Sequence, residues 1–157
     1  MTDGTQMERV ETTVAPSAKP AAVIISDAHG FAHLLQTLLD DVGVAVRTTV
    51  VGEGAPQLIE RLRPDVVLLD IVPGHEARSW QILEALKARG CTRSIPIVLC
   101  PAAPWLLDGH TDRIAQHRAL TWCNAFDLHD LLAKVEVALS CSPLRDMNTC
   151  RRSGRDE

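Results

Sequence analysis

The 157-residue chain contains no tyrosine, only three tryptophans and only two phenylalanines. So few aromatic rings offer little for stacking against nucleic-acid bases. The formal net charge of −4 gives no electrostatic reason for attraction to a polyanion either. We therefore expect no nucleic-acid partner.

Long uninterrupted apolar runs are also missing. The longest apolar-rich stretch, residues 95–107, contains Pro96, Pro101 and Pro104, and it is too short to span a bilayer. Residues 1–20 carry acids and no apolar segment of the kind that secretion signals have. The five cysteines are odd in number and form no C-x-x-C pair, which is typical of free thiols in a reducing compartment. These features predict a cytoplasmic protein without a membrane contact.

Two kinds of hydrophobic pattern alternate along the chain. Short apolar runs rich in β-branched residues predict buried strands, and apolar residues three and four positions apart predict helices. We expect strands at 21–26, 44–51, 65–71, 96–100 and 119–123, and helices at 29–42, 55–62, 76–89, 104–117 and 127–139. The fourth of these helices has a thin apolar face, and Asp108-Gly109 interrupts it. Asp127 stands where the N-cap of the fifth is expected.

This alternation predicts a parallel α/β sheet that is covered by helices on both faces. For a chain of this length we expect the doubly wound, flavodoxin-like arrangement of five strands in the order 2-1-3-4-5. Residues 21–140 would form this single domain. The polar residues 1–20 are expected to be a disordered leader, and residues 141–157, which are of mixed charge, a flexible tail.

Acidic residues close two of the predicted strands. Asp27 follows the first strand, and Asp70 ends the third, just before Pro73-Gly74. Because these strands are neighbours in the expected order, the two carboxylates should share a crevice at the carboxyl edge of the sheet. Paired carboxylates in such a crevice can bind Mg²⁺, a hard cation that keeps several of its waters.

Four segments of the chain resemble the receiver domain of two-component response regulators. They are residues 23–27, 65–71, 95–99 and 126–132, and the resemblance spans about residues 21–140. It implies phosphorelay chemistry, in which a phosphoryl group passes from a phosphohistidine to Asp70. It also implies Mg²⁺ at Asp27 and Asp70, and a signalling partner such as a histidine kinase or another regulator. The face made by the fourth helix, fifth strand and fifth helix is implied as a homodimer surface.

The sequence departs from this family at several functional positions. The usual pair of acids after the first strand is Ser26-Asp27 here, the Thr or Ser after the fourth strand is Pro101, and the Lys after the fifth strand is Asn124. Thr121 stands where the family often has a rotating aromatic residue. Proline has neither a hydroxyl nor an N–H, and asparagine has no charge, so little remains to hold a phosphoryl group.

We therefore interpret the chain as a degenerate receiver, or pseudo-receiver. It would be a stand-alone regulator in signal transduction, not an enzyme, and it would act through protein–protein contacts independently of phosphorylation. In this interpretation the protein needs no cofactor, and any Mg²⁺ at Asp27 and Asp70 is weakly bound. A phosphoryl-accepting receiver that uses Asp70 and Mg²⁺ is the first alternative.

Two further alternatives come from small motifs. The segment Asp27-Ala28-His29 is similar to the Asp-x-His-x-x-Gly loop of cobalamin-binding domains, whose histidine is the lower cobalt ligand, although Ala32 stands at the final glycine. Cys100 and Cys123 end neighbouring predicted strands. They can form a redox pair, or a soft-metal site with His29 and the acids, while buried structural thiols are the favoured interpretation.

Overall fold

The structure is a computed structural model of the chain, and it describes residues 19–123 and 127–140. The predicted tail, the predicted leader up to residue 18 and Asn124 lie outside the described residues. Among the residues described, no helix is long and apolar enough to cross a membrane.

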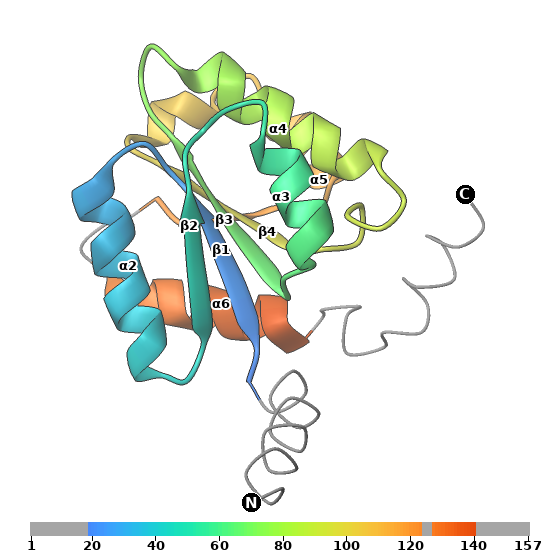
Figure 1. Cartoon of the computed structure of the whole chain (residues 1–157). Coiled ribbons are helices and arrows are strands. Elements are labelled where there is room, and N and C mark those ends of the chain that lie inside the picture. The colour runs from blue at the N-terminus through green and yellow to red at the C-terminus, as the bar shows by residue number, and fades with distance from the viewer. Residues whose placement is uncertain (1–18, 124–126, 141–157) are drawn as a thin grey trace, which may run out of the picture.

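Strands and helices alternate along the described chain (Figure 1). The strands are β1 (Ala21–Ile25), β2 (Ala45–Thr49), β3 (Val66–Ile71), β4 (Ile97–Pro101) and β5 (Leu120–Thr121). The helices are α2 (His29–Asp41), α3 (Ala55–Leu62), α4 (Glu76–Ala88), the 3₁₀-helix η1 (Pro104–Leu107), α5 (Thr111–Gln116) and α6 (Leu128–Ser140). All strand pairs are parallel, and the order is β2-β1-β3-β4-β5. The predicted flavodoxin-like arrangement is confirmed.

Two apolar layers cover the sheet, one on each face. Side chains of β1 and β3 alternate between the layers, because successive residues of a strand point to opposite faces. Helices α2 and α6 pack on the face that carries Ile24 and Leu68. Helices α3 and α4 pack on the face that carries Ile25 and Leu69. All of β3 is buried, so its end is held rigidly at the centre of the sheet.

The segment between β4 and β5 differs from the prediction. A single helix over residues 104–117 was expected, but the chain forms η1 and then the separate short helix α5. Gly109 between them has a φ of +81°, a left-handed conformation that glycine adopts at little cost and that ends a helix. Strand β5 is also shorter than expected, since only Leu120 and Thr121 pair with β4.

Asp127, the predicted N-cap, stands directly before the first residue of α6. The backbone N–H of Asp130 donates to Asp127 Oδ1 at 3.0 Å, as an N-cap requires. Asp127→Ala is therefore expected to lower the free energy of unfolding by about 1 kcal/mol in urea titrations. Asp127→Asn keeps an acceptor oxygen, so it should lose less stability. An equal loss in both variants would contradict a capping role.

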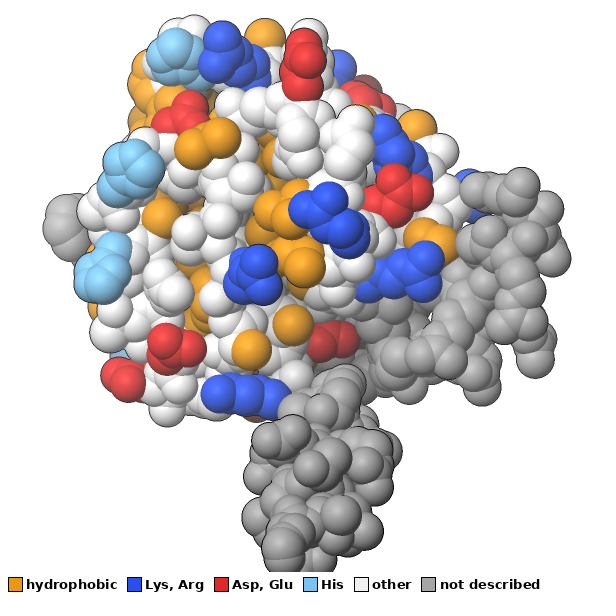
Figure 2. All heavy atoms as spheres, viewed as in Figure 1, with side chains coloured by type: hydrophobic (Ala, Val, Ile, Leu, Met, Phe, Trp, Pro, Cys, Tyr) orange, Lys and Arg blue, Asp and Glu red, His pale blue; other side chains and the backbone are white. Residues whose placement is uncertain are grey.

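A shallow groove of about 530 Å³ lies between α3 and α4. The face of the molecule in Figure 2 carries it, and apolar and basic side chains gather there. Its walls include Glu53, Arg78 and Arg89, and Arg89 pairs with Glu60 of α3 at 2.8 Å. The groove therefore carries both acidic and basic side chains, and the charge of Arg89 is already paired with that of Glu60.

Candidate functional site

Asp70 lies near the end of β3, and strand register brings Ser26 against it. Ile25 pairs with Leu69 across the β1–β3 ladder, so the next residue of each strand meets its counterpart. The Ser26 hydroxyl donates a hydrogen bond to Asp70 Oδ2 at 2.8 Å. Ser26 Oγ in turn accepts a hydrogen bond from the backbone N–H of Ala28 at 3.0 Å, which fixes the turn after β1. The hydroxyl of Ser26 is thus committed to Asp70.

The carboxyl group of Asp70 is almost withdrawn from solvent, with 7% of the residue exposed. Burial raises the pKa of Asp70 above its ordinary value, because a charged carboxylate loses its hydration there. Hydrogen bonds from Ser26 and from the backbone N–H of Ile71 oppose this pKa shift, and the charge of Asp27 adds to it. Burial is the largest of these effects, so the negative charge of Asp70 is harder to form than that of a solvated aspartate.

Asp27 holds a different part of the chain. Its Oδ1 accepts the backbone N–H of Val51 at 2.8 Å and so joins the β1–α2 turn to the loop after β2. The two acids lie at the same edge of the sheet, as predicted, but Ser26 is the side chain that contacts Asp70. Within residues 19–123 and 127–140, no three His, Cys, Asp or Glu side chains are grouped so that they could hold a metal ion.

A cavity of about 300 Å³ opens over Asp70, and we call it the Asp70 cavity. The other residues that line it are mostly apolar: Ala28, Phe31, Val72, Cys100, Pro101, Ala102 and Trp122. The rings of Phe31 and Trp122 are stacked, with 6.2 Å between centroids, and Trp122 Nε1 donates to the Asp127 carbonyl at 3.0 Å. Among the described residues no lysine or arginine lines the cavity. An anion in this cavity would meet apolar walls.

Two of the substituted positions, Pro101 and Thr121, lie at the carboxyl ends of β4 and β5. Pro101 ends β4 opposite Ile71, and it lines the Asp70 cavity. Thr121 lies in β5 opposite Leu99, while its neighbour Trp122 reaches the cavity. Sequence reasoning missed Phe31 as a lining residue. The one feature of the sequence that could have indicated Phe31 is its position in the first turn of the helix after β1.

The two small-motif alternatives gain no support from the geometry. His29 is the exposed first residue of α2. Cys100 is buried and Cys123 is exposed, and both are free thiols. Burial raises the pKa of the Cys100 thiol far above its ordinary value, with smaller contributions from the charges of Asp70 and Cys123. A thiol held protonated in this way is a poor nucleophile and a poor metal ligand.

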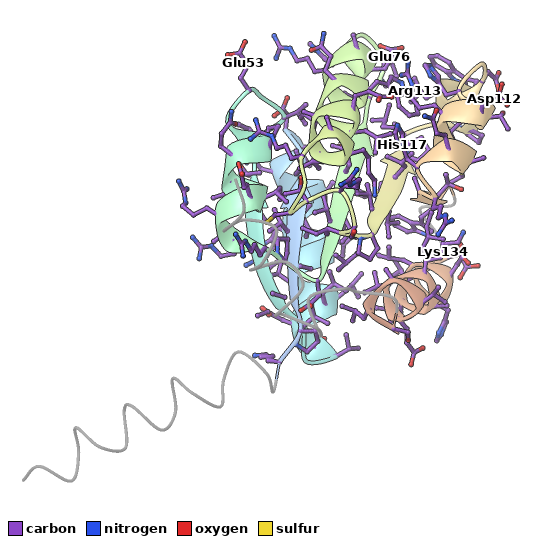
Figure 3. All side chains as sticks on the ribbon, turned by 90° about the vertical axis from the view of Figure 1, so that its right-hand side faces the viewer. Glu53, Glu76, Asp112, Arg113, His117 and Lys134 are labelled. Atoms are coloured by element: carbon purple, nitrogen blue, oxygen red, sulfur yellow. The ribbon has the colours of Figure 1, made fainter. Side chains whose placement is uncertain are left out.

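Polar and aromatic contacts fix α5 against α4. Arg113 and His117 project from α5 (Figure 3), and both bind Glu84 of α4, at 3.0 Å and 3.1 Å respectively. The ring of His110 stacks on Trp80, with 4.0 Å between centroids. Trp80 is buried, and its Nε1 has no hydrogen-bond partner among the described residues. These side-chain contacts with α4 therefore stabilise α5, which is too short to be stable by its own hydrogen bonds.

Solved structures of the same architecture are receiver domains. The BeF3-activated N-terminal receiver domain of Klebsiella pneumoniae RstA is 26% identical with a TM-score of 0.58, and the match covers 76% of this chain and 97% of that one. The N-terminal domain of a response regulator receiver protein from Methanoculleus marisnigri JR1 is 24% identical with a TM-score of 0.58, over 76% and 95% of the two chains. This chain has the receiver fold.

The receiver fold is also that of the Vibrio cholerae chemotaxis protein CheY4, which matches at 18% identity with a TM-score of 0.66 over 78% of this chain and all of that one. No protein-family model matches the sequence, and no curated protein matches it. The similarity to known proteins is therefore a similarity of fold. It does not by itself assign a chemical role to the residues around Asp70.

Proposed function

We propose that this protein is a signalling module of receiver type that works through protein–protein contacts, without phosphorylation of Asp70 and without catalysis of its own. One observation carries the proposal. The carboxyl group at the acceptor position is buried, hydrogen-bonded to Ser26 and covered by an apolar cavity. Its chemistry is that of a structural group in a core, which is opposite to that of an exposed nucleophile.

A phosphoryl group on Asp70 would meet an unfavourable environment. It carries a charge of about −1.5 to −2 at neutral pH, and it needs cations or several donors around it. Pro101 offers neither a hydroxyl nor an N–H, and Phe31 and Trp122 wall the cavity. A ligand shifts a conformational equilibrium only through contacts that differ between the two states, and few such contacts are available here.

The partner that we propose is another signalling protein, such as a histidine kinase or a second regulator. The homodimer through the face of α5, β5 and α6 stays a prediction, which light scattering of the purified chain checks. Weak Mg²⁺ binding at Asp27 and Asp70 also stays a prediction, and a Mg²⁺ titration followed by amide NMR measures it.

Beryllofluoride, a mimic of the phosphoryl group, tests the proposal directly. With Mg²⁺ and beryllofluoride added, we expect the amide NMR spectrum of the wild-type chain to change no more than that of Asp70→Asn, which lacks the acceptor carboxylate. Shifts that spread from Asp70 to β5 in the wild type alone would contradict the proposal. They would favour the alternative of a phosphoryl-accepting receiver that uses Mg²⁺.

A further inference from the structure

The carboxyl group of Asp70 can still accept hydrogen bonds from the Asp70 cavity. Asp70 lines this cavity although only 7% of the residue is exposed. An ionised carboxylate accepts about four hydrogen bonds. In the described part of the chain, Asp70 receives one from the Ser26 hydroxyl and one from the backbone N–H of Ile71. The carboxylate therefore has acceptor capacity left for a donor inside the cavity.

Several hydrogen-bond donors around the cavity already have partners. The backbone N–H of Ala28 donates to Ser26 Oγ at 3.0 Å. The backbone N–H of Ala102 donates to the Ile71 carbonyl at 2.9 Å. The indole N–H of Trp122 is bound to a backbone carbonyl as well. These walls therefore suit a ligand that donates hydrogen bonds better than one that accepts them.

The charges around the cavity are negative. Asp70 supplies one, and the charge of Asp27 lies near enough to raise the pKa of Asp70. Within residues 19–123 and 127–140, no cationic side chain of lysine or arginine lines the cavity. The walls include the rings of Phe31 and Trp122, and aromatic faces attract ammonium groups. A bound cation would favour the ionised form of Asp70 and offset the cost of burying its charge.

An organic cation matches this cavity better than a metal ion does. Mg²⁺ takes oxygen ligands and keeps several of its waters, whereas the walls beside Asp70 are mostly apolar. An ammonium ion on an apolar stem can donate to the carboxylate and cover these walls at the same time. The volume of about 300 Å³ is at the lower end of the range for ligand sites, so the ligand has to be compact.

We propose that the Asp70 cavity binds a small organic amine in its ammonium form. The ammonium group would donate to the Asp70 carboxylate, and the apolar stem would lie against Phe31, Val72 and Trp122. A free amine and a lysine side chain of a partner protein share this chemistry. The inference rests on the proposed function, because a phosphoryl group on Asp70 would occupy the same space.

Phenethylamine is the probe, and isothermal titration calorimetry with the full chain measures its dissociation constant. Phenethyl alcohol has the same size without the charge, and phenylacetate has the opposite charge. We expect the amine to bind about tenfold more tightly than the alcohol, the scale of one hydrogen bond to a charged group. Phenylacetate should not bind. Methylamine, which lacks the apolar stem, should bind much more weakly than phenethylamine.

A second arm distinguishes the two sources of the ammonium group. Lysine with an acetylated amino end and a methylamide at its carboxyl end presents only its side-chain charge. Tighter binding of this capped lysine than of phenethylamine would support a lysine of a partner protein as the ligand. Tighter binding of phenethylamine would support a free amine. Both results support an ammonium site at Asp70.

Variants locate the binding. Asp70→Asn removes the charge and is expected to weaken the binding of phenethylamine by about tenfold or more. Phe31→Leu keeps an apolar side chain without the ring and should weaken it about threefold. Asp41→Asn removes an exposed acid at the far end of α2 and is the matched control, with no expected effect. Urea titration checks that each variant is folded. Amide shifts on binding should centre on Asp70, Cys100 and Trp122.

Four results would overturn the inference. They are no binding of either amine, equal binding of phenethyl alcohol, tighter binding of phenylacetate, or equal binding of phenethylamine by Asp70→Asn and Asp41→Asn. No amine binding together with an unchanged beryllofluoride spectrum leaves the proposed function standing and removes only the amine site. A beryllofluoride response that Asp70→Asn abolishes removes the proposed function instead.

Discussion

The triple substitution Ser26→Asp, Pro101→Thr and Asn124→Lys is expected to produce a chain that binds beryllofluoride at Asp70. Residue 26 is in direct contact with Asp70, since the Ser26 hydroxyl lies 2.8 Å from Asp70 Oδ2. Pro101 lines the same cavity. A carboxylate would therefore contact Asp70, and a hydroxyl would line its cavity. The resemblance to receiver domains implies that a lysine at position 124 supplies the cation.

Mg²⁺ alone, without a phosphoryl mimic, should stabilise the triple variant. Two carboxylates in contact repel, and one of them is then held protonated or the fold is destabilised. Mg²⁺ relieves this repulsion, so the triple variant should gain about 2.7 kcal/mol of stability at a Mg²⁺ concentration near one hundred times its dissociation constant. The wild-type chain should gain far less under the same conditions. Thermal unfolding with and without Mg²⁺ measures the difference.

The second effect is the response to beryllofluoride in the amide NMR spectrum. The triple variant should show shifts from β3 to β5, and the same variant with Asp70→Asn added should show none. A folded triple variant that binds Mg²⁺ but shows no shifts with beryllofluoride would mean that these three residues are not sufficient for a phosphoryl site. The stacked rings of Phe31 and Trp122 over the Asp70 cavity would then be the next cause to test.

The substitution Asp70→Asn in the wild-type background should stabilise the fold at neutral pH. The pKa of Asp70 is raised in the folded chain above its ordinary value of 3.8, chiefly by burial. The native state thus holds a proton that the unfolded state releases as the pH rises past 3.8. Stability from this group is greatest below that pH, and it falls as the pH rises toward the folded-state pKa. At neutral pH the buried charge is a net cost, and the amide removes it.

We expect Asp70→Asn to raise the free energy of unfolding at pH 7 by about 1–3 kcal/mol, the scale of a buried polar group that is poorly compensated. The gain should disappear below the unfolded-state pKa. Ser26→Ala is the matched contrast, because it removes the donor and keeps the charge, so it should lower stability at pH 7. Urea titrations from acid to neutral pH measure both. A loss of stability in Asp70→Asn at pH 7 would mean that the carboxylate is better solvated than its burial indicates.

The local patterns of the sequence determined most of the fold. Apolar periodicity depends on neighbours a few residues apart, so it identified the strands and helices. The preferred winding of parallel units then predicted the sheet order. The same local chemistry identified Asp127 as an N-cap. The sequence pattern was least informative between β4 and β5. The apolar face is thin there, and the positive φ of Gly109 separates η1 from α5.

The sequence also predicted which positions depart from the receiver pattern, because Ser26 and Pro101 can be aligned by position along strands. It could not determine their contacts. The hydrogen bond from Ser26 to Asp70 follows from the register of β1 against β3, and the stack of Phe31 on Trp122 joins two distant segments.

Only the tertiary structure brought Phe31, Pro101 and Trp122 together to line the Asp70 cavity. Long-range contacts depend on how whole elements pack, and a local pattern carries no record of that packing. The sequence by itself thus determined the receiver architecture and the positions at which its residues depart from the pattern of the receiver family. The tertiary structure decided that the carboxyl group of Asp70 is buried, hydrogen-bonded to Ser26 and covered by apolar residues.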